Sequence, residues 1–164
     1  MTPDLIGFIR VLSGAGVDYI IVGGVAAGIH GALRTTLDFD VVYARTQENI
    51  GRLVAALGSF DPYPRGAPAG LPFRLDEETM ARGLNFTLST GLGDLDLLGE
   101  VTGGGGFEQL EASSEVVAIE GVECRVVSLR ALIGLKRAAG RGKDREALAE
   151  LEALLEERDR REGP

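Results

Sequence analysis

Two aspartates, Asp38 and Asp40, stand two residues apart in an apolar stretch of the sequence. Side chains two apart on a β-strand point to the same face, so a strand here would hold both carboxylates roughly 6 to 7 Å apart. Two like charges at that distance repel each other, and a hard, oxygen-liganded divalent cation would offset the repulsion. The same spacing is also common on solvated strand faces, so a metal site needs support from other residues.

A double glycine, Gly23-Gly24, follows an apolar run at residues 19–22 that is typical of a strand. Where a strand turns into a helix, backbone N–H groups can face an anion, and glycine lets a phosphate approach the backbone closely. The predicted order is therefore strand, glycine turn, a short helix over residues 25–32, and the strand that carries both aspartates. A phosphate site beside a carboxylate-bound metal indicates a nucleoside triphosphate.

Two other sites that use such residues do not fit the sequence. An EF-hand loop that began at Asp38 would need Gly at its sixth position and Glu at its twelfth, and both are missing. A dinucleotide-binding turn has the pattern Gly-x-Gly-x-x-Gly, whereas this chain has Gly23-Gly24-x-x-x-Gly28 without a repeating βαβ pattern behind it.

Gly23-Gly24, thirteen intervening residues and Asp38-x-Asp40 resemble the signature of the nucleotidyltransferase superfamily, the DNA polymerase β type of fold. The run Arg34-x-Thr36-x-Asp38-x-Asp40 resembles more narrowly the small bacterial members related to abortive-infection and toxin–antitoxin nucleotidyltransferases. In the wider family the second glycine is often a serine, a hydroxyl that Gly24 lacks. The resemblance implies the minimal nucleotidyltransferase fold, an α+β sandwich in which helices pack against a mixed β-sheet.

A third carboxylate is expected on a later strand, because two-metal phosphoryl-transfer sites need one from another part of the fold. The resemblance selects Gly93-x-x-Asp96-x-Leu98 as that strand, which makes Asp96 the third carboxylate. Asp94 would lie on the same face of the strand and is the alternative, with the expected role of a solvated surface acid.

The resemblance extends to the basic stretch from Lys136 to Arg145, so it spans roughly residues 15–155. This stretch could hold a triphosphate tail or a nucleic-acid acceptor, or it could neutralise a helix end. Arg34 could reach a phosphate or form a surface ion pair. The implied sets are Asp38, Asp40 and Asp96 for catalysis and metal binding; Gly23, Gly24, Arg34, Thr36 and Lys136 for the nucleotide; and Arg137, Arg141 and Lys143 for the acceptor.

Length and composition limit the number of domains and the classes of protein to which this sequence can belong. The 164 residues suit one domain, with a core at about 15–127 and a helical segment at about 128–161. No apolar run reaches the roughly 20 residues of a membrane span, there is no secretory signal, and the single cysteine allows no internal disulfide. We therefore expect a cytoplasmic protein. The net charge of −8 argues against broad non-specific nucleic-acid binding.

The remaining elements follow from periodicity and turn residues. Thr2 is predicted to cap a first helix that ends near Gly14, and His30 is predicted to be structural. Leu37 is placed on the buried face of its strand. Further helices are predicted from Thr46 to Leu57, from Ser128 onward and at about 143–161; strands at 84–89, 95–98, 116–119 and 124–127; and loops at 58–72 and 103–106.

The sequence therefore predicts transfer of a nucleoside monophosphate from a nucleoside triphosphate to an acceptor hydroxyl, with release of pyrophosphate. Asp38 and Asp40 would hold Mg²⁺ or Mn²⁺ against the triphosphate, and Asp96 would complete a second metal site. The acceptor would be an RNA end or a partner protein of a toxin–antitoxin pair. The alternative is a non-catalytic binding or regulatory protein with the same fold, which the presence of all three carboxylates disfavours.

Overall fold

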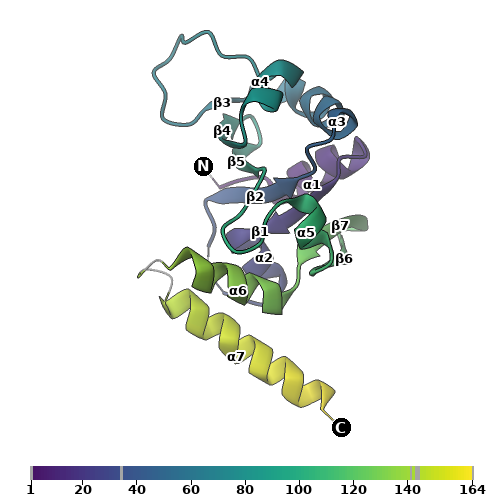
Figure 1. Ribbon diagram of the computed structural model, residues 1–164, viewed down its shortest axis with the longest axis vertical. Helices are drawn as coiled ribbons and strands as arrows, with labels where there is room; N and C mark the ends of the chain where they lie inside the picture. The colour runs from purple at the N-terminus through teal and green to yellow at the C-terminus, as the bar shows by residue number, and fades with distance from the viewer. Residues whose placement is uncertain (1, 34, 141, 143–144, 164) are drawn as a thin grey trace.

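The computed structural model describes residues 2–33, 35–140, 142 and 145–163. A seven-stranded sheet forms the centre of this part of the chain (Figure 1). Its strand order is β3-β4-β5-β2-β1-β7-β6. The strands are β1 (Tyr19–Val22), β2 (Asp38–Tyr43), β3 (Tyr63–Pro64), β4 (Asn85–Thr90), β5 (Gly93–Leu98), β6 (Ser114–Ile119) and β7 (Val122–Val127).

The sheet is mixed. β2 runs parallel to β5 and β1 runs parallel to β7, whereas the other neighbouring strands are antiparallel. In the β2–β5 register, Asp38 lies opposite Asp94 and Asp40 lies opposite Asp96. A mixed sheet with packed helices is the α+β fold that the sequence predicts, so this prediction is confirmed.

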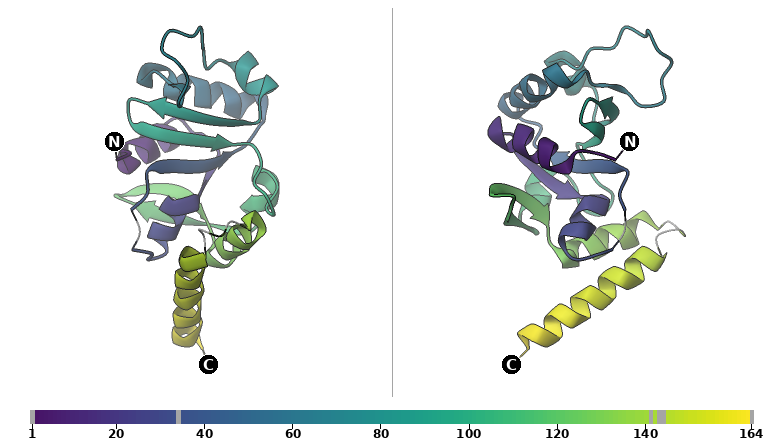
Figure 2. Two further views of the ribbon diagram at one scale, coloured as in Figure 1. Left: turned by 90° about the vertical axis from the view of Figure 1, so that its left-hand side faces the viewer. Right: turned by 180° about the vertical axis from the view of Figure 1, so that it is seen from behind.

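Helices cover one face of the central strands and leave the other largely open. In the left view of Figure 2, β2, β4 and β5 lie in front and the two helices α1 and α3 lie behind them. The short helix α2 joins β1 to β2 and contacts α6. The helices are α1 (Leu5–Gly14), α2 (Gly23–Ile29), α3 (Gln47–Leu57), η1 (Gly58–Phe60), α4 (Glu77–Arg82), α5 (Phe107–Glu111), α6 (Leu129–Ala139) and α7 (Arg145–Glu162).

Side-chain caps begin several of these helices. Thr46 and Ser128 each accept a hydrogen bond from the N–H three residues later, as predicted, and so satisfy a donor that has no helical partner. The prediction that Thr2 caps the first helix is wrong. The carboxylate of Asp4 accepts the N–H of Gly7 instead, because Asp caps as well as Thr does and stands three residues before Gly7, directly ahead of α1.

Apolar side chains of β2 join the sheet to α1. Phe39, Val41 and Tyr43 are fully buried, and the Phe39 ring stacks on Phe8 with ring centroids 5.1 Å apart. The prediction that Leu37 belongs to this buried face is wrong, since its side chain is 68 % exposed. β2 begins one residue after Leu37, so the alternation of the strand does not govern that residue.

The segment predicted as a loop over residues 58–72 contains the edge strand β3. Its two residues, Tyr63 and Pro64, pair with β4. Proline is tolerated on an edge strand because its missing N–H removes no interior hydrogen bond. A strand of two residues has no visible alternation, so the sequence could not reveal it. Beyond β3 the chain swings outward before it returns to α4 (Figure 1).

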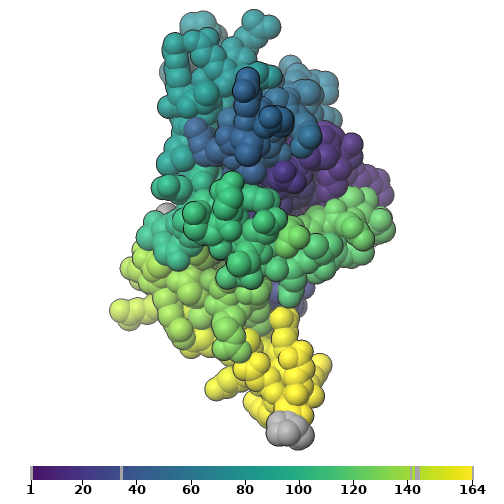
Figure 3. Space-filling model, turned by 45° about the vertical axis from the view of Figure 1, so that its right-hand side comes forward, coloured from purple at the N-terminus to yellow at the C-terminus, as the bar shows by residue number. Residues whose placement is uncertain are grey.

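The C-terminal helix α7 packs against α6 and projects from the rest of the molecule (Figure 3). It also reaches His30, which is buried. The Nε2 atom of His30 lies 2.8 Å from the carbonyl oxygen of Val127, and its Nδ1 atom lies 3.3 Å from a guanidinium nitrogen of Arg158. The Nε2–H therefore donates while Nδ1 accepts, which is a structural role.

Membrane insertion finds no support in the helices of the described residues, because none combines the length and apolar character of a membrane span.

Candidate active site

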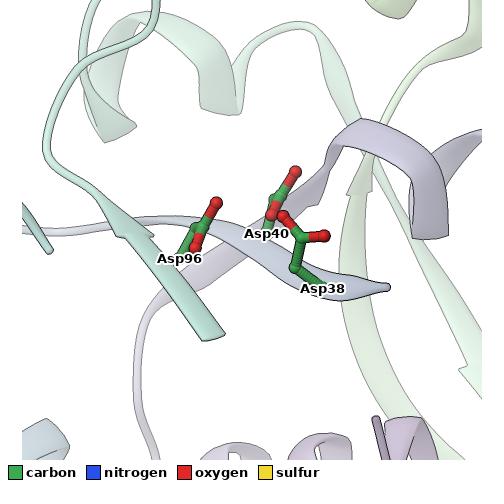
Figure 4. A group of neighbouring side chains, drawn as sticks. All are labelled: Asp38, Asp40 and Asp96. Atoms are coloured by element: carbon green, nitrogen blue, oxygen red, sulfur yellow. The ribbon is translucent and has the colours of Figure 1, made fainter. Parts of the chain in front are cut away.

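Three carboxylates meet on the open face of the sheet (Figure 4). Asp38 and Asp40 come from β2 and Asp96 comes from β5. Each offers one oxygen, and these oxygens all lie within 4.8 Å of one another. Because β2 and β5 pair directly, the strand register itself brings Asp96 against the other two. The three aspartates predicted from the sequence therefore lie together.

The cluster is short of positive charge. The Oδ1 atom of Asp40 is buried and has no hydrogen-bond partner among the residues that the structure describes. Burial, reinforced by the charges of Asp96 and Asp38, raises the pKa of Asp40 to about 8. Burial and the charge of Asp96 also raise the pKa of Asp38. Buried carboxylates with an unpartnered oxygen are the donor set that a hard divalent cation prefers, so these residues fit Mg²⁺ or Mn²⁺.

Gly23 gives Asp40 the space it occupies. The backbone of Gly23 has a φ of +67°, and a Cβ atom at this position would lie 2.3 Å from the Oδ2 atom of Asp40. A side chain here would therefore be strained by the backbone and would displace the carboxylate. The double glycine is required by the site itself and not only by the turn from β1 into α2.

We expect Gly23→Ala to destabilise the protein by about 1–2 kcal/mol, the cost of a left-handed alanine, and to weaken Mn²⁺ binding because Asp40 must move. Thermal unfolding and Mn²⁺ titration measure the two effects. Gly28→Ala is the matched control. It lies in the same helix with no atom within 4 Å of its added Cβ, so it should be neutral or slightly stabilising. Equal behaviour of both variants would show that Asp40 does not need this space.

Gly24 is explained by Thr36. A Cβ atom at position 24 would lie 2.9 Å from the Oγ1 atom of Thr36, which is closer than real Cβ contacts. The Thr36 hydroxyl also donates a 2.8 Å hydrogen bond to the backbone oxygen of Asp38. Thr36 thus fixes the start of β2 and fills the space that a side chain at position 24 would need.

A cleft of about 350 Å³ opens beside Asp40. It lies between the start of α2, the end of β5 and the helix α6, and it is lined by Gly23, Asp40 and Lys136 together with apolar side chains such as Leu132. This volume falls in the usual range for small-ligand sites. The cleft places the predicted nucleotide-binding residues Gly23 and Lys136 beside one metal-ligand candidate.

Arg65, which the sequence did not single out, lies against the third carboxylate. One guanidinium nitrogen is 2.7 Å from the Oδ1 atom of Asp96, and Nε is 3.3 Å from the Oδ2 atom of Asp94. Burial alone would lower the pKa of Arg65, but the hydrogen bond to Asp96 and its charge raise it. The side chain of Asp94 is 37 % exposed, which agrees with the expected surface acid, and the structure adds its ion pair with Arg65. Arg65 was hidden within a segment predicted to be a loop.

The residues of the basic stretch from Lys136 to Arg145 do not all have the same role. Lys136 lines the cleft, whereas Arg137 forms a 2.7 Å ion pair with Glu152 between α6 and α7. This contact gives Arg137 a role in holding the two helices together. The other predicted basic site residues, Arg34, Arg141 and Lys143, lie outside the residues that the structure describes.

No protein-family model and no curated protein matches this sequence. Solved structures with a similar fold include the following three. The lincosamide antibiotic adenylyltransferase LnuA in its lincomycin-bound form has a TM-score of 0.61 at 13% identity, over 92% of this chain and 96% of its own. A candidate nucleotidyltransferase from Thermotoga maritima has a TM-score of 0.55 at 14% identity, over 89% and 88%. An antigenic nucleotidyltransferase-like protein from Paracoccidioides brasiliensis has a TM-score of 0.55 at 15% identity, over 92% and 73%.

The chain therefore shares its fold with these three structures, and this is the α+β fold that the sequence predicted. Its cluster of Asp38, Asp40 and Asp96 could hold a metal ion. At these identities the likeness establishes the fold, and the activity rests on the residues of this chain.

Proposed function

We propose that the protein is a metal-dependent nucleotidyltransferase that transfers a nucleoside monophosphate from a nucleoside triphosphate to an acceptor hydroxyl. The observation that supports this most is the meeting of three carboxylates, of which Asp40 has a buried unpartnered oxygen and lines a ligand-sized cleft. A solvated surface cluster would not bury an oxygen without a partner.

In this proposal, Asp38 and Asp40 hold Mg²⁺ or Mn²⁺ and Asp96 completes the ligand set. Bound there, the cation would neutralise the triphosphate and lower the pKa of the attacking hydroxyl. Lys136, on the wall of the cleft, contacts the triphosphate as a point charge. Gly23 and Gly24 let the phosphates approach the backbone, and Thr36 holds the start of β2. Arg34, which lies outside the described residues, is proposed as a further phosphate contact.

The transfer exchanges one phosphorus–oxygen bond for another. The acceptor oxygen bonds to the α-phosphorus, the bond from that phosphorus to the bridging oxygen of pyrophosphate breaks, and pyrophosphate leaves with the bond electrons. The hydroxyl proton is released to solvent by way of Asp96. The carboxylates contribute chiefly by positioning and by charge, which dominate catalysis of phosphoryl-type transfer.

For the acceptor, we propose an RNA end or a partner protein, as in the toxin–antitoxin nucleotidyltransferases that the Arg34-to-Asp40 run resembles. The open sheet face beside Asp96 supports a large acceptor, because Asn85 and Thr87 on the neighbouring strand β4 are exposed. A small acceptor would instead need a walled pocket. LnuA, whose structure contains lincomycin, represents that competing class.

The test incubates the purified protein with each labelled nucleoside triphosphate and Mg²⁺ or Mn²⁺, in the presence of total RNA, protein extract or a panel of small hydroxylated compounds. We expect metal-dependent pyrophosphate release and label in the RNA or the protein fraction, both lost in Asp38→Ala. Labelling of RNA should decrease at high salt. Label only in small compounds overturns the acceptor proposal. Nucleotide binding without pyrophosphate release would show the alternative, a non-catalytic binding protein.

A further inference from the structure

We propose that Arg65 is a positioning residue that sets the orientation of Asp96 and thereby its ability to bind metal. This inference rests on the proposed function, since it concerns the third carboxylate of the same site. Arg65 holds two carboxylates of β5 at once, through separate nitrogens of one planar guanidinium group.

Arg65 is itself fixed from three directions. Its backbone N–H donates to the carbonyl oxygen of Thr87 at 3.0 Å, which continues the β3–β4 pairing by one residue. The guanidinium nitrogen that contacts Asp96 also donates to the carbonyl oxygen of Leu88 at 2.9 Å. Nε forms an ion pair with Asp94 at 3.3 Å but no hydrogen bond, so the hydrogen bonds of the other nitrogen to Leu88 and Asp96 are what limit rotation of the fork. A guanidinium group that is held in this way also fixes the orientation of the carboxylate that it contacts.

The contact restrains the orientation of the Asp96 carboxylate. Oδ1 accepts the Arg65 hydrogen bond at 2.7 Å, so this carboxylate cannot rotate freely relative to Asp38 and Asp40. Carboxylates that ligate metals are commonly held by such outer hydrogen bonds, and loss of the outer partner typically costs 10- to 100-fold in metal affinity or activity. Asp94 then affects metal binding through Arg65, because it is the second carboxylate that contacts the guanidinium group.

The charge of Arg65 has a further effect at the same place. Asp94 and Asp96 stand opposite Asp38 and Asp40 in the sheet, so four carboxylates occupy adjacent positions. A single guanidinium between two of them offsets part of their repulsion. Arg65 can therefore keep Asp96 close to its neighbours before a cation arrives.

The decisive variant is Arg65→Lys, which keeps the charge and removes the planar fork. We expect Mn²⁺ binding to the nucleotide-free protein, measured by calorimetry, to weaken 10- to 100-fold. We also expect kcat to fall with little change in the KM for the triphosphate, because Asp38 and Asp40 remain. Arg45→Lys is the matched control. Arg45 also donates to backbone carbonyls, at Met80 and Ala81, and none of these residues belongs to the site, so its metal binding should equal wild type.

Asp94→Asn supplies the second arm. If Asp94 acts through Arg65, Asp94→Asn should lose less Mn²⁺ affinity than Arg65→Lys does. The double variant should then bind Mn²⁺ no more weakly than Arg65→Lys alone. If the losses of affinity in the two single variants multiply in the double variant, Asp94 is a direct ligand, and this part of the inference is overturned.

Two other results would overturn the role of Arg65. If Arg65→Lys binds Mn²⁺ as the wild type does, Arg65 acts only as a counter-charge. If Arg65→Gln binds Mn²⁺ more tightly than the wild type, Arg65 competes with the metal. Both results leave the proposed function intact. Absence of Mn²⁺ binding in the wild type would overturn the proposed function itself, so the two failures are distinguishable.

Discussion

The Asp40→Asn variant should lose nucleotidyl transfer by about 10³-fold or more while it remains folded. Charge stabilisation by a bound divalent ion is worth several kcal/mol, and each 1.36 kcal/mol is a factor of ten in rate. Asn has the size of Asp but lacks the charge that a cation needs. Because burial raises the pKa of Asp40 to about 8, the metal-free wild type already carries a largely neutral side chain near pH 7, so folding should not suffer.

Steady-state pyrophosphate release and thermal unfolding measure the two sides of this prediction. Asp96→Asn is the comparison. It should also abolish transfer, but it should leave triphosphate binding largely intact because Asp38 and Asp40 remain. Transfer retained in Asp40→Asn, at a rate within tenfold of wild type, would remove Asp40 from the reaction. A collapse of the fold in that variant would show that its charge serves stability.

The metal-free protein should become less stable as the pH rises from about 4 to about 8. The pKa of Asp40 lies near 8 in the folded state and near the ordinary 3.8 when the chain is unfolded. Between these values the folded state binds more protons than the unfolded state, so stability falls with rising pH. Each unit of pKa difference is worth about 1.4 kcal/mol, or roughly 4 °C in Tm for a domain of this size. Above pH 8 this contribution should level off.

Thermal unfolding between pH 4 and pH 9, with chelator or with Mg²⁺, measures this dependence. Asp40→Asn isolates the contribution of one carboxylate from all other titrating groups, and its Tm should vary less with pH than that of the wild type. Added Mg²⁺ should restore Tm most at high pH, because the cation must displace the proton. A metal-free Tm difference between variant and wild type that is constant with pH would contradict the raised pKa.

Patterns of local residues predicted the metal-ligand candidates and most of the regular elements. The two aspartates of β2 follow from a two-residue spacing, and the caps Thr46 and Ser128 follow from their own side chains. The choice of Asp96 over Asp94 depended on a family resemblance, because both lie on one face of β5. The structure separates them by position, because Asp96 offers an oxygen within 4.8 Å of those of Asp38 and Asp40, whereas Asp94 does not belong to that cluster.

The parts that the sequence could not predict depend on pairing between distant strands. β3 is too short for any pattern, so Arg65 could not be placed beside β5. The 3.3 Å contact of Arg65 with Asp94 likewise depends on the register of three strands. The need for glycine at position 23 was predicted from phosphate binding, whereas the structure adds a steric reason in the nearby carboxylate.

The parallel pairing of β2 with β5 has a consequence for the order of folding. These strands are joined by a long segment that includes α3, β3, α4 and β4. Their pairing therefore closes a large loop, and such non-local contacts form slowly. Their facing aspartates oppose this closure by repulsion, while the antiparallel hairpin of β4 and β5 can form locally and already brings Thr87 opposite Asp96. We infer that the hairpin docks onto β2 as a unit, so no nascent chain that ends before β5 carries the assembled site.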